Sequence, residues 1–214
     1  MDEEIKIIDT KTRNEKLKIF FKENRKLIFS ILLLFLITIF GIYSFQIYKN
    51  SQRESISDKY NLVVINYNQS DKSKTISSMK EIVNMQDKTY SPLALYFLID
   101  NNLVDNADEI NLLFDILIND ISFENEIKNL IIYKKALYNA DNINESDFLN
   151  ILSPVINSES IWKSHALFLT AEYFYNQNEK QKSREFFEQI LSLENVDNEI
   201  KIKAQKRITR DLSE

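Results

Sequence analysis

Residues 167–191 read LFLTAEYFYNQNEKQKSREFFEQIL, and this segment is the most informative about the fold. Large apolar residues recur in it every three or four positions, first before and then after a polar turn centred on Asn178. Apolar residues with this period form one face of a helix. The stretch therefore predicts two helices that pack against each other as an antiparallel pair.

The spacing within this stretch is that of a tetratricopeptide repeat, a unit of two helices. Small residues allow close contact of the two helices, and aromatic residues fill the space beside them. We expect the pair to be packed by Leu167, Ala171, Phe174, Ser183, Phe187 and Ile190. Trp162 departs from the repeat register, Asn195 replaces the usual final proline, and a weaker echo lies around Ala136 and Tyr138.

Helical periodicity extends over the chain that precedes and follows this pair. We expect helices near residues 56–67, 76–87, 91–99, 107–117, 127–138, 145–152, 158–173, after 178 and after 197. Polar residues 68–71 end the first of these helices, Ser91 caps the third, and Ser153-Pro154 ends the sixth. Asn178 with Gln181 caps the eighth helix and Asp197 caps the ninth.

Loops of about 3–6 residues between such helices favour stacked antiparallel neighbours. The single glycine in the chain argues against hairpin-rich β-structure, because tight hairpins need that residue. The predicted fold class is therefore all-α: one transmembrane helix followed by stacked antiparallel helical hairpins, a tetratricopeptide-like α-solenoid.

The transmembrane helix is predicted from residues 27–48, which contain no charged side chain. As a helix this run is about 33 Å long, enough to cross a hydrocarbon core of about 30 Å. A cleavable signal peptide has a shorter apolar region and a site of small residues after it. Residues 46–50, QIYKN, offer no such site, so we expect a retained anchor.

Basic residues predict the direction of the anchor, because they collect on the cytoplasmic side. Residues 11–26 contain seven lysines and arginines, whereas Lys49, Arg53 and Lys59 follow the span. The expected organisation is a cytoplasmic basic arm at 1–26, the transmembrane helix at 27–48 and a periplasmic helical domain at 49–214. The sequence leaves open whether the first helix after the span continues it.

Composition excludes several classes of function. The chain has no cysteine, so it contains no disulfide, no thiolate nucleophile and no cysteine zinc site. Residues 49–214 contain 26 acidic and 19 basic residues, an acidic balance that argues against nucleic-acid binding. With one histidine and no glycine-rich phosphate loop, we expect no catalytic residue, no cofactor and no metal site.

The order of these parts resembles the YfgM-like family, the ancillary subunit of the bacterial SecYEG translocon. The resemblance rests on the basic arm, the span, the polar residues 51–54, the segment 161–166 and the clearest repeat at 167–191. It implies an inner-membrane protein with a periplasmic tetratricopeptide-like domain. It also implies two partners, Sec translocon subunits and a membrane-anchored periplasmic chaperone.

Candidate binding residues come from the abundant aromatics, most of which we expect in the core. Tyr173 and Tyr175 are the hypothesised contacts for an extended polypeptide, since aromatic side chains bind with a modest loss of entropy. His165 is expected at a groove edge or in a partly buried pocket where its hydrogen bonds are satisfied. Acidic residues such as Glu126 and Glu109 are better explained as favourable helix N-terminal charges than as cation ligands.

The sequence thus predicts a non-enzymatic, membrane-anchored interaction protein that assists exported chains beside the Sec translocon. The alternative within the same class is an envelope-assembly or cell-division scaffold. A homo-oligomer joined through the span and the helix near 56–67 is also open.

Overall fold

The chain is all-α in the computed structural model, which describes residues 15, 16, 18–67, 72–194 and 196–212. Every regular element in these ranges is a helix, so the predicted fold class is confirmed. Contacts divide the chain into two units, Met1–Ser55 and Ile56–Glu214. The predicted break at 68–71 and the arm residues Lys11 and Arg13 lie outside the described residues.

The first unit contains most of helix α2, Arg25–Ile65, which is 41 residues long and has no buried residue. Within the described chain, α2 is the helix that is long and apolar enough to cross a membrane. A retained anchor and a signal sequence both meet this test of length and composition. The helix runs without interruption past residue 48, so the first predicted helix after the span is a continuation of it.

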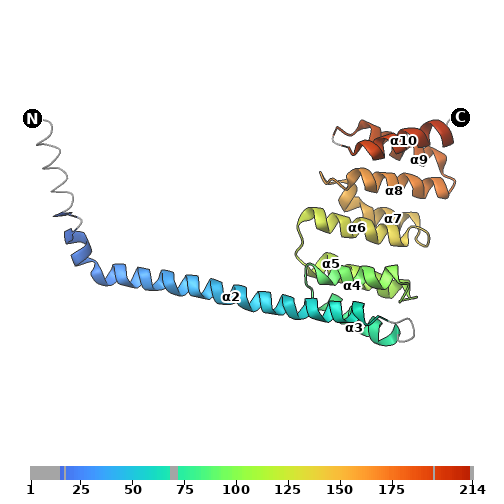
Figure 1. The fold of residues 1–214 in the computed structure, drawn as a ribbon. Helices are drawn as coiled ribbons and strands as arrows, with labels where there is room; N and C mark the ends of the chain where they lie inside the picture. The colour runs from blue at the N-terminus through green and yellow to red at the C-terminus, as the bar shows by residue number, and fades with distance from the viewer. Residues whose placement is uncertain (1–14, 17, 68–71, 195, 213–214) are drawn as a thin grey trace, which may run out of the picture. The chain divides into compact units, whose positions relative to one another are not determined.

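The second unit contains the end of α2 and a series of shorter helices, which Figure 1 shows stacked in chain order. Their lengths, 11–15 residues, match the amphipathic periods in the sequence. The bounds are α3 Lys72–Asn84, α4 Tyr90–Asp100, α5 Ala107–Asp120, α6 Asn125–Asn139, α7 Glu145–Ile156, α8 Lys163–Asn176, α9 Lys180–Ser192 and α10 Asn198–Asp211.

Three apolar clusters fill the spaces between these helices. The first joins α3, α4 and α5 around Phe114, and Ile56 and Tyr60 from the end of α2 pack against it. The second joins α6, α7 and α8 around Phe148, and the third joins α8, α9 and α10 around Phe187. Each of these phenylalanines is fully buried, which stabilises the fold by about 1.5–3 kcal/mol per side chain.

Helix starts agree with the sequence at α10 and differ at α4. Asp197 caps α10 as predicted, since its side chain accepts hydrogen bonds from the backbone N–H groups of Glu199 and Ile200. The prediction that Ser91 caps α4 is wrong. The carboxylate of Asp87 accepts from the N–H groups before Ser91, whereas the Ser91 hydroxyl is buried and donates to the Ile82 carbonyl, 2.8 Å away.

Two other predicted boundaries are corrected by packing. Pro154 does not end α7, which continues to Ile156 because Val155 is fully buried in the second cluster. A proline in the last turn interrupts one hydrogen bond, and this burial offsets the loss. Helix α8 begins at Lys163 and not near Ser158, because residues 157–162 form the turn that leads into it.

Asparagine performs the role of glycine at two helix ends. Asn102 and Asn178 have φ of 48° and 63°, the left-handed region. After α8 the N–H of Glu179 donates to the Phe174 carbonyl, 2.9 Å away, and the N–H of Asn178 donates to the Tyr175 carbonyl, 3.0 Å away. This is the Schellman arrangement. Asn178 therefore ends α8 and is not the predicted cap of α9, whose N-cap residue is Glu179.

Replacing Asn178 by alanine is expected to lower the free energy of unfolding by about 1 kcal/mol, because alanine tolerates the left-handed conformation poorly. Thermal unfolding of the full chain in detergent, followed by far-UV circular dichroism, measures this change. Asn176→Ala is the matched control: Asn176 is the exposed last residue of α8, and its replacement should change stability by less than about 0.5 kcal/mol. Equal effects of the two substitutions would contradict the role of Asn178.

Candidate functional site

The α8–α9 hairpin is the centre of the candidate site, and its predicted packing residues are all buried. Leu167, Ala171, Phe187 and Ile190 lie in the third cluster, together with Ala204 of α10. Phe174 points to the other side, into the second cluster. Ser183 is fully buried, and its hydroxyl has no hydrogen-bond partner among the described residues. The hairpin thus contacts α6 and α7 on one side and α10 on the other.

Tyr173 lies in the core and not on a surface. Its ring stacks on Phe148 with 4.1 Å between ring centroids, and only 5% of the residue is exposed. Its hydroxyl donates to the carbonyl oxygen of Ile143, 3.0 Å away. Burial raises the pKa of Tyr173, and the nearby Glu145 and Glu179 add to this effect. A direct contact between Tyr173 and a polypeptide would require the ring to leave this stack.

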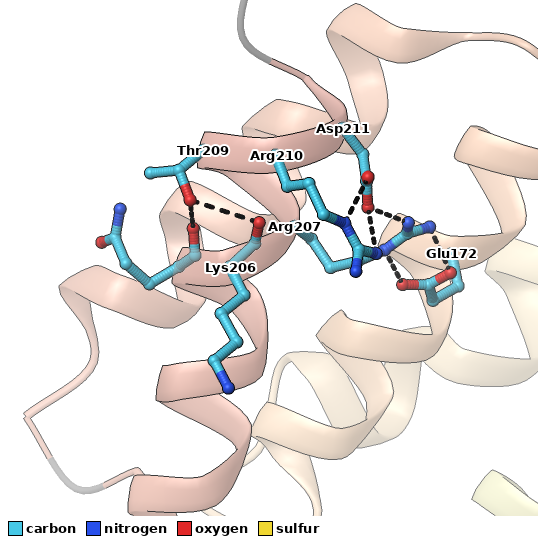
Figure 2. A network of polar contacts seen from close by, with 7 residues as sticks. Glu172, Lys206, Arg207, Thr209, Arg210 and Asp211 are labelled. Atoms are coloured by element: carbon cyan, nitrogen blue, oxygen red, sulfur yellow. Dashed lines mark hydrogen bonds and ion pairs between the residues drawn. The ribbon is translucent and has the colours of Figure 1, made fainter.

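Tyr175 is half-buried, and its ring makes a cation–π contact with a side chain of α10. The Arg207 guanidinium lies over the Tyr175 ring, 4.1 Å from its centroid. Arg207 also donates to both carboxylate oxygens of Glu172, over 2.6 Å and 2.7 Å (Figure 2). This two-pronged geometry is the strongest form of ion pair. It ties the end of α10 to α8 and occupies part of the surface beside Tyr175.

Asp211 completes this network at the end of α10. It contacts Arg207, and it accepts hydrogen bonds from Arg210 over 2.7 Å and 2.8 Å (Figure 2). The hydrogen bonds from Arg210 and Arg207 lower the pKa of Asp211 to about 2, against the opposing effect of burial. Sequence reasoning missed the network, because no pattern in the chain links Glu172 with α10.

A second group of side chains lies at the beginning of α8. The rings of Tyr133, Trp162 and His165 lie 5.1–6.1 Å apart, measured between centroids. His165 is half-buried, but its Nδ1 atom has no hydrogen-bond partner within the described chain, so its surroundings are not the satisfied pocket that was one of the two expectations. Beside these rings is a pocket of about 290 Å³, lined by Ile161, Trp162, His165 and Asp197.

Glu126 of α6 holds the segment that carries Trp162. Its carboxylate accepts from the Ser160 hydroxyl, 2.6 Å away, and from the Ile161 backbone N–H, 3.3 Å away. Ser160 in turn accepts from the Trp162 N–H. Glu126 therefore positions the aromatic group. Among the described residues no group of acidic or histidine side chains is arranged to hold a metal ion.

Comparison with known families adds one finding. Residues 18–107 match the sequence model of a tetratricopeptide repeat-like domain. The match contains α2, α3 and α4 and ends at the first residue of α5. The repeat spacing read at 167–191 lies beyond it. Comparisons with curated proteins and with solved structures gave no significant match.

The match and the stacked helical pairs agree on a tetratricopeptide-like solenoid. Repeats of this kind are typically non-catalytic scaffolds that bind other proteins. The chain therefore carries a protein–protein interaction module. Its accessible candidate surfaces are the pocket beside Trp162 and the region around Tyr175.

Acidification should weaken the attachment of α10, because folding lowers the pKa of Asp211 from 3.8 to about 2. A carboxyl group with a lowered pKa stabilises the folded state fully above its ordinary pKa. This stabilisation is lost as the pH falls from about 4 towards 2. At neutral pH the variant Asp211→Asn should be less stable than the parent, and the difference should shrink below about pH 4. Thermal unfolding of both proteins across this range measures it.

Glu199→Gln controls for the removal of one negative charge, since Glu199 pairs with Lys203 on an exposed part of α10. A stability difference between parent and Asp211→Asn that stays constant from neutral pH to about pH 2 would contradict the assignment.

Proposed function

We propose that this protein is a membrane-anchored interaction subunit of the protein-export machinery. In this proposal it binds Sec translocon subunits and a membrane-anchored periplasmic chaperone, and it assists polypeptides as they leave the channel. The observation that carries the proposal is the family match at 18–107, which covers the apolar helix together with the first helical layers. That unit is the YfgM-type tetratricopeptide arrangement that the sequence resembles.

Tethering gives the proposed mechanism its physical basis. A binding surface anchored beside an exit channel meets emerging segments at a high effective concentration, so weak contacts suffice. The half-buried Tyr175 is the better placed of the two predicted peptide contacts, because Tyr173 is closed off by Phe148.

The proposed topology places residues 1–26 in the cytoplasm, a retained transmembrane helix at 27–48, and residues 49–214 in the periplasm. The exposed apolar side chains of α2 suit a lipid environment, since none of its residues is buried by protein. The excess of basic residues before the span sets the direction.

Single cysteines introduced into this cysteine-free chain test the topology directly. In intact cells, a membrane-impermeant maleimide should label Ser51→Cys once the outer membrane is permeabilised, whereas Ser30→Cys and Lys16→Cys should stay unlabelled. Labelling of position 16 without labelling of position 51 would show that the orientation is opposite to the proposed one. Loss of the N-terminal segment from the mature protein would show that the apolar helix is a cleaved signal sequence.

Crosslinking in the native membrane, followed by purification in mild detergent, tests the partners. The proposal expects translocon subunits and a membrane-anchored chaperone among the recovered proteins, and weaker recovery with Tyr175→Ala. Tyr173→Phe is the control, because it removes a buried hydroxyl and leaves the surface unchanged. Recovery of cell-division or envelope-assembly proteins alone would contradict the export role and support the alternative, a scaffold for cell division or envelope assembly.

A further inference from the structure

The pocket beside Trp162 combines aromatic walls with a carboxylate. Ile161 and Trp162 come from the turn before α8, His165 from the first turn of α8, and Asp197 from the N-cap position of α10. The cavity measures about 290 Å³, which suits one side chain and not an extended segment. Ile161 lies at its edge with 71% of its surface exposed, so the pocket opens beside an accessible apolar residue.

The Trp162 ring that lines the pocket is held in place by neighbouring side chains. Tyr133 of α6 stacks on Trp162 with 6.0 Å between centroids and an angle of 23° between the rings. His165 packs against Trp162 at 5.1 Å. The contacts from Glu126 to Ser160 and Ile161 hold the chain directly before Trp162. A ring held in this way binds a ligand with little further loss of entropy.

The charge around the pocket is negative. Residues 158–165 and 193–199, the two segments that contribute the lining side chains, contain four acidic residues and one lysine. One of the acids, Glu199, is neutralised by Lys203. Asp197 uses one carboxylate oxygen, Oδ1, to cap α10. Its exposed carboxylate lies at the edge of a cavity otherwise lined by Ile161, Trp162 and His165, where it adds a negative charge beside the rings.

The same chain repeatedly places cations over aromatic rings. Lys134 lies over Tyr96 at 4.5 Å, Lys182 over Phe174 at 4.9 Å, and Arg207 over Tyr175 at 4.1 Å. Tryptophan is the ring that attracts cations most strongly. Within the described ranges, no lysine or arginine of the chain itself covers Trp162 in this way.

We propose that this pocket binds one cationic side chain, lysine or arginine, of a polypeptide partner. The cation would lie against the Trp162 ring and pair with the Asp197 carboxylate, while the neighbouring partner residue covers Ile161. This inference rests on the proposed function in that it takes the ligand to be a polypeptide. It adds a chemical preference: partners or clients are selected at this point for a positive charge.

Trp162 is the single tryptophan of the chain, so its fluorescence reports on this pocket without a label. The full-length protein in detergent is titrated at neutral pH and low salt with a capped pentapeptide of four alanines around a central arginine. The matched probe carries citrulline, which has nearly the same shape and no charge. The arginine peptide should give a saturable change, and the citrulline peptide should bind about tenfold more weakly.

Asp197→Asn separates charge from structure, because asparagine caps a helix as well as aspartate does. This variant should bind the arginine peptide about tenfold more weakly than the parent, with unchanged thermal unfolding. Glu199→Gln removes a charge from the same helix end outside the pocket and should keep the parent affinity. Absence of saturable binding, equal affinity for the two peptides, or parent-like affinity of Asp197→Asn would each overturn the inference.

The co-purification experiment tests the proposed function independently. Recovery of export components without arginine-peptide binding would overturn the pocket assignment alone. Arginine-peptide binding that depends on Asp197, without recovery of export components, would support the pocket and overturn the proposed function.

Discussion

Burial of helix α8 on two opposite sides is the constraint on which the stack depends. Leu167 and Ala171 face α9 and α10, whereas Ala166 and Phe174 face α6 and α7. A helix that is apolar on both sides has no stable solvent-exposed form, so it requires a layer on each side. The same logic applies at α6, where Ile131 belongs to the first cluster and Ala136 to the second. Neighbouring cores therefore share a helix, and no layer is self-sufficient.

Polar contacts between layers fix how the helices of this apolar stack are aligned with one another. Asn111 of α5 and Asn139 of α6 exchange two amide hydrogen bonds of 2.8 Å each. Glu126 ties α6 to the segment before α8, and Arg207 ties α10 to Glu172. Apolar packing alone tolerates sliding of one helix along another, whereas these bonds have fixed partners. They hold the Trp162 ring and the Tyr175 surface in place, which links the architecture to binding.

The helices were predictable because their signal is local. Apolar residues three and four positions apart identify each helix whatever its neighbours are. The cap at Asp197 was predictable for the same reason, since the capping side chain bonds to its own helix. The roles predicted for Ser91 as the cap of α4, for Pro154 as the end of α7 and for Asn178 as the cap of α9 are wrong. In these cases a neighbouring layer, a buried Val155 or a left-handed turn decided the outcome, and none of these is visible in a short window of sequence.

The same distinction between local and long-range determinants applies to the candidate site. The all-α class, the apolar helix at 27–48, the repeat spacing at 167–191 and the acidic, cysteine-free composition can be read from the chain. These properties follow from residue type and spacing alone. The packing of the helices was needed to show that Tyr173 is covered by Phe148, that Arg207 lies on Tyr175, and that Asp197 and Trp162 line one pocket. Those residues come from helices 25 or more positions apart in the chain, and only the stacking of layers brings them together.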